Sequence, residues 1–80
     1  MTEDKPRDLG EQPLARRMSE RSLAPADLVA ASTEQLTHKM VSRAMKGRRL
    51  TRNTMDKVVR AWNAATEGTD TAPELFDYAP

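Results

Sequence analysis

An apolar stripe at helical spacing, in the second half of the chain, constrains the fold more than any other feature of the sequence. Its members fall three, four, seven and ten positions after the first, and they are Met55, Val58, Val59, Trp62 and Ala65. At about 3.6 residues per turn, these side chains share one side of a helix. Thr51 is a preferred N-cap residue and Glu67-Gly68 is a typical helix end, so we predict an amphipathic helix between them.

Shorter helices are predicted upstream, and no segment alternates with the period of a strand. Pro13 suits the first position of a helix in which Leu14 and Met18 lie four residues apart. A second short helix begins at Pro25, with Asp27 favourably placed against the helix dipole. The sequence therefore predicts an all-α fold, a small bundle of four to five short helices.

The third predicted helix has a clear end and two competing starts. Gly47 suits the left-handed residue that stops a helix after Lys46. Ser32 opens a Ser-Thr-Glu-Gln sequence that matches a capping box, while Thr37 is a rival N-cap. The sequence leaves both starts open.

The rest of the chain flanks one domain. Eighty residues allow a single small core, which we place at residues 12–67. The first ten residues hold five charges and few apolar side chains, so residues 1–11 are predicted to be a disordered arm. Residues 68–80 form a polar linker and an apolar tail. Its large side chains either close the core or dock on a second copy of the chain or a partner protein, and they are Leu75, Phe76 and Tyr78.

The composition excludes most kinds of catalytic and metal-binding site. The chain has no cysteine, which removes disulfides, thiolate catalysis and cysteine-based zinc sites. His38 is the only histidine, and it lies among basic residues rather than beside an acid. The carboxylates are scattered singly, without the spacing of a calcium loop. We therefore expect no enzymatic activity, no cofactor and no metal.

Hydropathy indicates a cytoplasmic protein. No stretch approaches the roughly 18 apolar residues of a membrane span. The N-terminal sequence Met-Thr-Glu-Asp-Lys lacks the basic-then-apolar order of a signal peptide. We expect no membrane partner.

Charge is distributed unevenly along the chain, although the formal net charge is only +1. Residues 36–60 carry eight Lys and Arg against one acidic residue. Residues 61–80 carry four acidic residues and no Lys or Arg. A basic block of this density attracts phosphate backbones.

The third predicted helix divides this block into two chemically opposite faces. Its apolar face contains Leu36, Met40, Val41 and Ala44. Its polar face contains Gln35, Lys39, Ser42, Arg43 and Lys46. No acidic residue lies between these cations, whereas a simply solvated helix face interleaves opposite charges.

Three sequence features follow one another along residues 36–48. They are an apolar residue before a threonine cap at Leu36-Thr37, an apolar residue and a serine at Val41-Ser42, and a basic-glycine-basic corner at Lys46-Gly47-Arg48. In this order residues 36–63 resemble the Cro/lambda-repressor-like helix-turn-helix family, of the XRE type, and the resemblance extends more weakly over residues 12–66. The sequence departs from that family at residues 30–35, which contain no glycine and are about two residues longer than its tight turn.

The resemblance implies a recognition helix at about residues 37–46. It places Leu36, Val41 and Ala44 in the core. It implies DNA contacts that fall into two groups. Those that face the major groove come from His38, Lys39, Ser42 and Arg43, of which Lys39 and Arg43 are able to reach guanine. Thr37 is the cap of the helix, and Thr37 or Ser42 can bond a phosphate. Backbone contacts come from Lys46, Arg48, Arg49 and Arg52.

Sequence-specific binding of double-stranded DNA is the function that these expectations favour. The protein would be a small bacterial transcription regulator or the DNA-binding half of a two-gene system, and dimerisation would give it two half-sites. The alternative is a helical adaptor whose basic face binds an acidic protein. RNA binding is less favoured, because no aromatic residues are interleaved with the basic ones for base stacking.

Overall fold

The computed structural model describes residues 9–78. These residues form five α-helices and no strand, which confirms the predicted all-α class. The helices are α1 (Pro13–Glu20), α2 (Pro25–Ala31), α3 (His38–Lys46), α4 (Arg52–Thr66) and α5 (Ala72–Leu75). Most of the predicted N-terminal arm, residues 1–8, lies outside the described residues.

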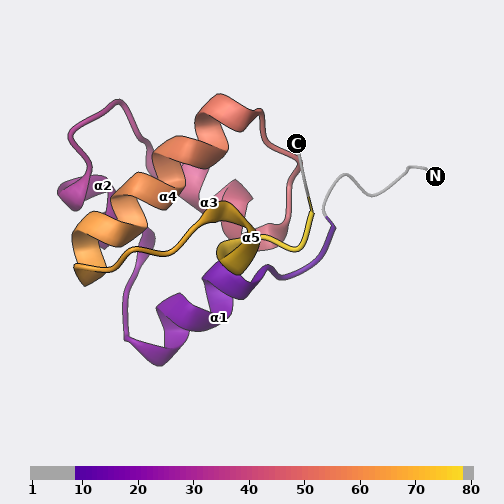
Figure 1. Cartoon of the computed structure of the whole chain (residues 1–80), viewed down its shortest axis with the longest axis horizontal. Helices are drawn as coiled ribbons and strands as arrows, with labels where there is room; N and C mark the ends of the chain where they lie inside the picture. Colours follow the sequence, from indigo (N-terminus) through magenta and orange to yellow (C-terminus); the bar gives the residue numbers. More distant parts are fainter. Residues whose placement is uncertain (1–8, 79–80) are drawn as a thin grey trace.

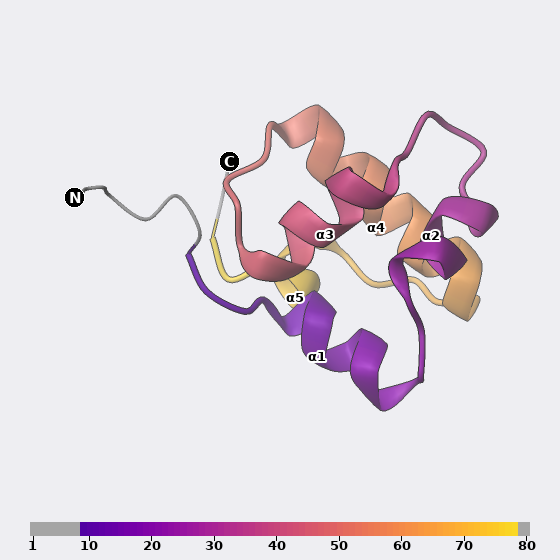
Figure 2. The same cartoon turned by 180° about the vertical axis from the view of Figure 1, so that it is seen from behind.

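The two helices of the basic block lie on opposite sides of the molecule (Figures 1 and 2). Figure 1 shows α4 at the front, and the reverse view in Figure 2 shows α3 at the front. Helix α2 packs against both of them, while α1 packs against α3 and the short α5. Helices α3 and α4 also pack directly against each other.

The core lies between these helices and is built mostly from aliphatic side chains. Trp62 of α4 is its largest member and is 1% exposed. Three of the five residues in the predicted α4 stripe belong to the core, and the other two, Val59 and Ala65, are partly buried against it. The buried hydrophobic cluster comprises Leu14, Met18, Leu28, Leu36, Val41, Ala44, Met55, Val58, Ala61, Trp62, Leu75 and Phe76.

The apolar tail belongs to this core. Leu75 is fully buried and Phe76 is 2% exposed. Helix α5, which presents them, begins with a capping box in which Glu74 accepts the backbone N–H of Thr71 at 2.6 Å. Of the two roles predicted for the tail, closing the core is the one that Leu75 and Phe76 perform in the single chain.

The third helix begins at the later of its two predicted starts. The Thr37 side chain accepts a hydrogen bond from the backbone N–H of Met40 at 3.2 Å, which is an N-cap. Ser32 instead ends α2 with an extended backbone. Its hydroxyl accepts from the N–H of Glu34 at 3.1 Å, so the serine stabilises a local turn and starts no helix. Gln35 consequently lies in the loop, outside the helical face to which its spacing assigned it.

The end of α4 differs slightly from the expected one. Glu67, and not Gly68, adopts the left-handed conformation after the helix, with φ of 56°. The backbone N–H of Gly68 then donates to the carbonyl of Asn63 at 3.0 Å. A Cβ on Gly68 would lie 3.0 Å from the Thr66 hydroxyl, a tight contact that the threonine side chain would have to relieve by a small shift.

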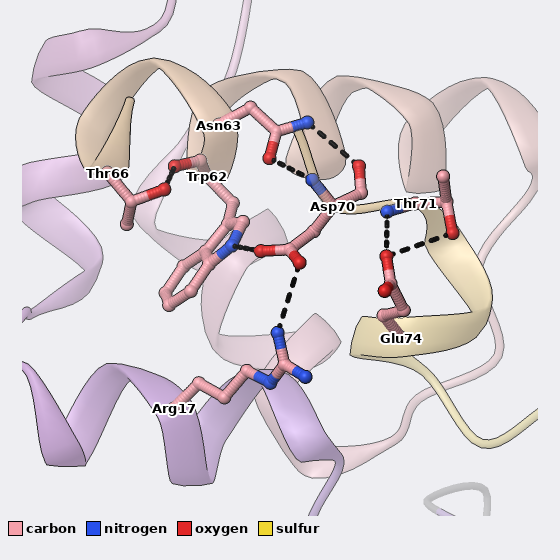
Figure 3. A network of polar contacts seen from close by, with 7 residues as sticks. All are labelled: Arg17, Trp62, Asn63, Thr66, Asp70, Thr71 and Glu74. Atoms are coloured by element: carbon pink, nitrogen blue, oxygen red, sulfur yellow. Dashed lines mark hydrogen bonds and ion pairs between the residues drawn. The ribbon is translucent and has the colours of Figure 1, made fainter. Parts of the chain in front are cut away.

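A polar network holds the segment between α4 and α5, which the sequence analysis treated as a linker (Figure 3). The Asp70 carboxylate accepts the indole N–H of Trp62 at 2.6 Å and pairs with Arg17 of α1 at 3.3 Å. The Asn63 side chain bonds the Asp70 backbone in both directions, at 2.9 Å each. The indole N–H and the Arg17 guanidinium lower the pKa of Asp70.

No helix within residues 9–78 is both long enough and apolar enough to cross a membrane.

Candidate nucleic-acid interface

Helix α3 carries the basic face, and both of its ends are fixed by local chemistry. Thr37 caps its start. Gly47 ends it in a left-handed conformation with φ of 86°, and the N–H of Arg48 returns to the carbonyl of Arg43 at 2.9 Å. Val41 and Ala44 are fully buried, which anchors one side of the helix against the core.

The opposite side of α3 faces solvent. At about 100° per residue, positions 38, 39, 42, 43 and 46 fall within an arc of roughly 140°. Of these residues only Ser42 is partly buried, and the others are exposed. Together with Arg48 they surround one surface hollow of about 310 Å³. We call this hollow the α3 concavity, and its lining residues are His38, Lys39, Ser42, Arg43, Lys46 and Arg48.

The α3 concavity is positive and contains no carboxylate among its lining residues. Within residues 9–78, no acidic side chain pairs with Lys39, Arg43 or Lys46. The neighbouring Glu34 is held elsewhere, because Arg60 of α4 binds both of its oxygens, at 2.6 and 2.7 Å. This hydrogen bonding lowers the pKa of Glu34, so the carboxylate stays ionised and engaged with α4.

The acidic tail does not cover this surface either. Asp70 pairs with Arg17 of α1, and Glu74 bonds Thr71 at the start of α5. Asp77 lies at a separate pocket beside Arg52. Among the described residues, the tail acids therefore leave the α3 concavity open.

The corner after α3 is held by Tyr78, a contact that the sequence analysis did not foresee. The Tyr78 hydroxyl accepts from the N–H of Leu50 and donates to the carbonyl of Arg48, both at 3.0 Å. The Arg49 guanidinium lies 5.5 Å from the centre of the Tyr78 ring. Burial raises the pKa of the Tyr78 phenol, so the hydroxyl remains a donor at neutral pH.

A buried glutamine supports the same corner from the N-terminal side. Gln12 is fully buried, and its backbone N–H donates to the carbonyl of Met45 at 3.0 Å. Its side chain donates to the carbonyl of Gly10 and accepts from the N–H of Asp77. Nothing in the sequence around Gln12 distinguishes it from a surface residue.

Three predicted site residues lie outside the α3 concavity. Thr37 is exposed at the start of α3, where its side chain serves as the cap. Arg49 is turned toward Tyr78. Arg52, the first residue of α4, lines a different pocket of about 470 Å³ together with Asp56 and Asp77. Six of the nine predicted contact residues are thus brought together and three are not.

His38 occupies the exposed first turn of α3. Among residues 9–78, no three His, Asp or Glu side chains come together as potential metal ligands. In this surrounding the imidazole is a surface hydrogen-bonding group of the concavity.

Fold and site together define a small all-α domain that exposes one basic helix. Comparisons with protein-family models, with curated proteins and with solved structures find no match to this chain. The functional argument consequently depends on the α3 concavity itself.

Proposed function

We propose that the protein binds double-stranded DNA in a sequence-specific manner through α3 and acts as a small transcription regulator of the Cro/lambda-repressor-like helix-turn-helix type. The observation that carries this proposal is the α3 concavity, which four cations and a histidine line together and which no acidic residue among residues 9–78 lines. Phosphate backbones and the electronegative major-groove edges of bases are suited to such a surface.

The dimensions of α3 support the proposal. With its side chains an α-helix is about 10–12 Å across, which fits the roughly 12 Å width of the major groove. The N-terminal residues of a recognition helix contact base edges. In that arrangement His38 and Lys39 are closest to the bases, while Lys46 and Arg48 at the other end contact phosphates.

Two half-sites would make binding tight, because one domain of this size contacts few bases. We propose that a second copy or a partner protein supplies the other half. Leu75 and Phe76 are already buried in the single chain, so of the three tail residues only Tyr78 retains exposed surface for such a contact.

The proposed role is binding rather than catalysis. A catalytic histidine needs an orienting acid, and among residues 9–78 no hydrogen bond or ion pair joins His38 to one. A His38→Ala variant whose loss of biological activity is no larger than its loss of DNA affinity would support this part of the proposal.

A duplex titration followed by backbone amide NMR tests the proposal. We expect shifts concentrated in residues 36–52. We also expect log affinity to fall with log salt at a slope of about 0.9 per phosphate contact, hence several units in total. No duplex binding at low salt would overturn the proposal and favour the adaptor for an acidic protein.

Variants separate specific from general contacts. The double variant Lys39→Ala, Arg43→Ala is expected to bind different duplex sequences with more similar affinities. Arg48→Ala is expected to lower the affinity for all duplexes by about the same factor. Arg16→Ala is a matched control, because it removes one positive charge from an exposed position on α1.

A further inference from the structure

The side chains that α3 offers to a base differ in what they can donate and accept. Lysine and arginine are donors only, and a neutral histidine or a serine can do both. The first two turns of α3 expose Lys39 and Arg43, and within residues 9–78 neither is engaged by an acidic side chain. Their donors are therefore available to a ligand that presents acceptors.

Among major-groove edges, guanine presents two adjacent acceptors, N7 and O6. We propose that Lys39 and Arg43 are the specificity-determining residues of the α3 concavity and that they direct it to guanine. This inference depends on the proposed DNA binding and adds the base that is recognised.

The concavity offers the other bases fewer partners, because only His38 and Ser42 can both donate and accept there. Adenine is recognised through a carboxamide that both donates and accepts, and cytosine through a carboxylate that accepts from its amino group. Within the part of the chain that the structure describes, no Asn, Gln, Asp or Glu lines the α3 concavity. The nearest amide in sequence, Gln35, lies in the loop before the helix, outside the lining residues.

Thymine is also disfavoured. Its methyl group is recognised by apolar contact. The apolar side chains of α3 face the core, where Val41 and Ala44 are fully buried and Met40 and Met45 pack against them. The lining of the concavity contains no apolar residue.

The spacing of the two residues defines the arrangement of the guanines. Lys39 and Arg43 are four residues apart, which is about 6 Å along the helix. Successive base pairs are about 3.4 Å apart. The two side chains therefore address guanines on neighbouring or next-neighbouring base pairs.

The test begins with selection of duplexes from a random pool by the full chain at moderate salt. We expect the selected sequences to share guanines within two base-pair steps of each other. Each selected guanine is then replaced by 7-deazaguanine, which removes the N7 acceptor and leaves charge and pairing intact. Affinity is expected to fall by about fivefold or more, the lower end for a bidentate base contact.

Combining each protein variant with each modified duplex shows which side chain contacts which guanine. In Lys39→Ala or Arg43→Ala the difference between guanine and 7-deazaguanine duplexes is expected to vanish for one of the guanines. In the control Arg16→Ala it is expected to persist in full. If a residue only maintained the fold, its replacement would not abolish the affinity difference that removing the N7 atom of one guanine causes.

Two results would overturn the inference while the proposed function stands. One is specific binding that 7-deazaguanine leaves unchanged, and the other is selection of sites without shared guanines. Absence of any duplex binding would instead remove the proposed function, and the guanine preference with it.

Discussion

Gly47 shows how a single residue fixes the end of the basic helix. Its φ of 86° is a conformation that residues with a Cβ rarely adopt. A Cβ at this position would also overlap the carbonyl oxygen of Gly10 and lie 2.8 Å from the Gln12 side chain. The glycine therefore permits both the helix stop and the approach of the N-terminal segment.

We predict that Gly47→Ala lowers the free energy of unfolding by more than the 1–2 kcal/mol or so that the left-handed conformation costs alone. Urea unfolding followed by circular dichroism measures this. Gly10→Ala is the matched control, because Gly10 also has positive φ, at 100°, but a Cβ there meets nothing within 4 Å. Equal losses in the two variants would show that the close contact is unimportant.

The Asp70 carboxylate gives a prediction about pH. Its pKa lies below the ordinary value of about 3.9, because the Trp62 indole and Arg17 stabilise the charged form in the folded chain. The resulting stability is present above pH 4 and is lost as the pH falls through the folded pKa. Asp70→Asn should lower Tm at neutral pH and make Tm less dependent on pH below 4.

Thermal melts at a series of pH values provide the measurement. Glu20→Gln serves as the control, since Glu20 is an exposed carboxylate at the end of α1. That variant should keep the wild-type acid dependence. If Asp70→Asn kept it too, the carboxylate would not be part of the structural network.

At the level of elements, the choice between Ser32 and Thr37 is decided by what each hydroxyl can bond. We predict that Thr37→Ala costs about 1 kcal/mol of unfolding free energy, because the N–H of Met40 loses its cap. Ser32→Ala should stay within about 0.5 kcal/mol, since it loses only a loop contact. Chemical denaturation of both variants checks the order, and the reverse order would contradict the observed start of α3.

The start or end of a helix could be predicted wherever a residue at that position itself favours a helix start or end. Pro13, Pro25 and Thr51 mark starts, Gly47 marks an end, and the apolar periodicity marks the buried faces. The capping box at Ser32 is also a local signal, and it is wrong because a serine satisfies a turn as readily as a helix. Local patterns cannot choose between two uses of the same hydroxyl.

The basic site was predictable to the extent that it lies on one helix. Residues at 38, 39, 42, 43 and 46 share a face by periodicity alone, and the α3 concavity contains all five. The loop residue Arg49 and the α4 residue Arg52 depend on contacts across the fold. The Tyr78 hydroxyl meets the Arg48 carbonyl 30 residues away, a distance in sequence at which no pattern carries information.

On the scale of the whole molecule, charge is sorted into separate regions. The net charge of +1 conceals a basic helix face and an acidic tail. The tail acids Asp70 and Glu74 are bound near α1 and α5, while the cations Lys39, Arg43 and Lys46 of α3 face solvent. This separation gives the small domain a directional field, which favours oriented approach to a polyanion.

The same tail determines whether the domain is stable, and this leads to a prediction about the core. Small domains of this size rarely have more than about 3–5 kcal/mol of stability. Phe76→Ala removes a buried aromatic ring, which typically costs about 3–5 kcal/mol. We therefore expect this variant to be largely unfolded at room temperature, with loss of helical circular dichroism.

A graded pair of variants makes this prediction specific. Phe76→Leu retains most of the buried volume and should fold with a lowered Tm. Leu9→Ala changes a side chain that is 46% exposed and should alter stability by no more than about 0.5 kcal/mol. A cooperative wild-type melt from Phe76→Ala would mean that α5 is dispensable, and that the basic face is supported by the first four helices alone.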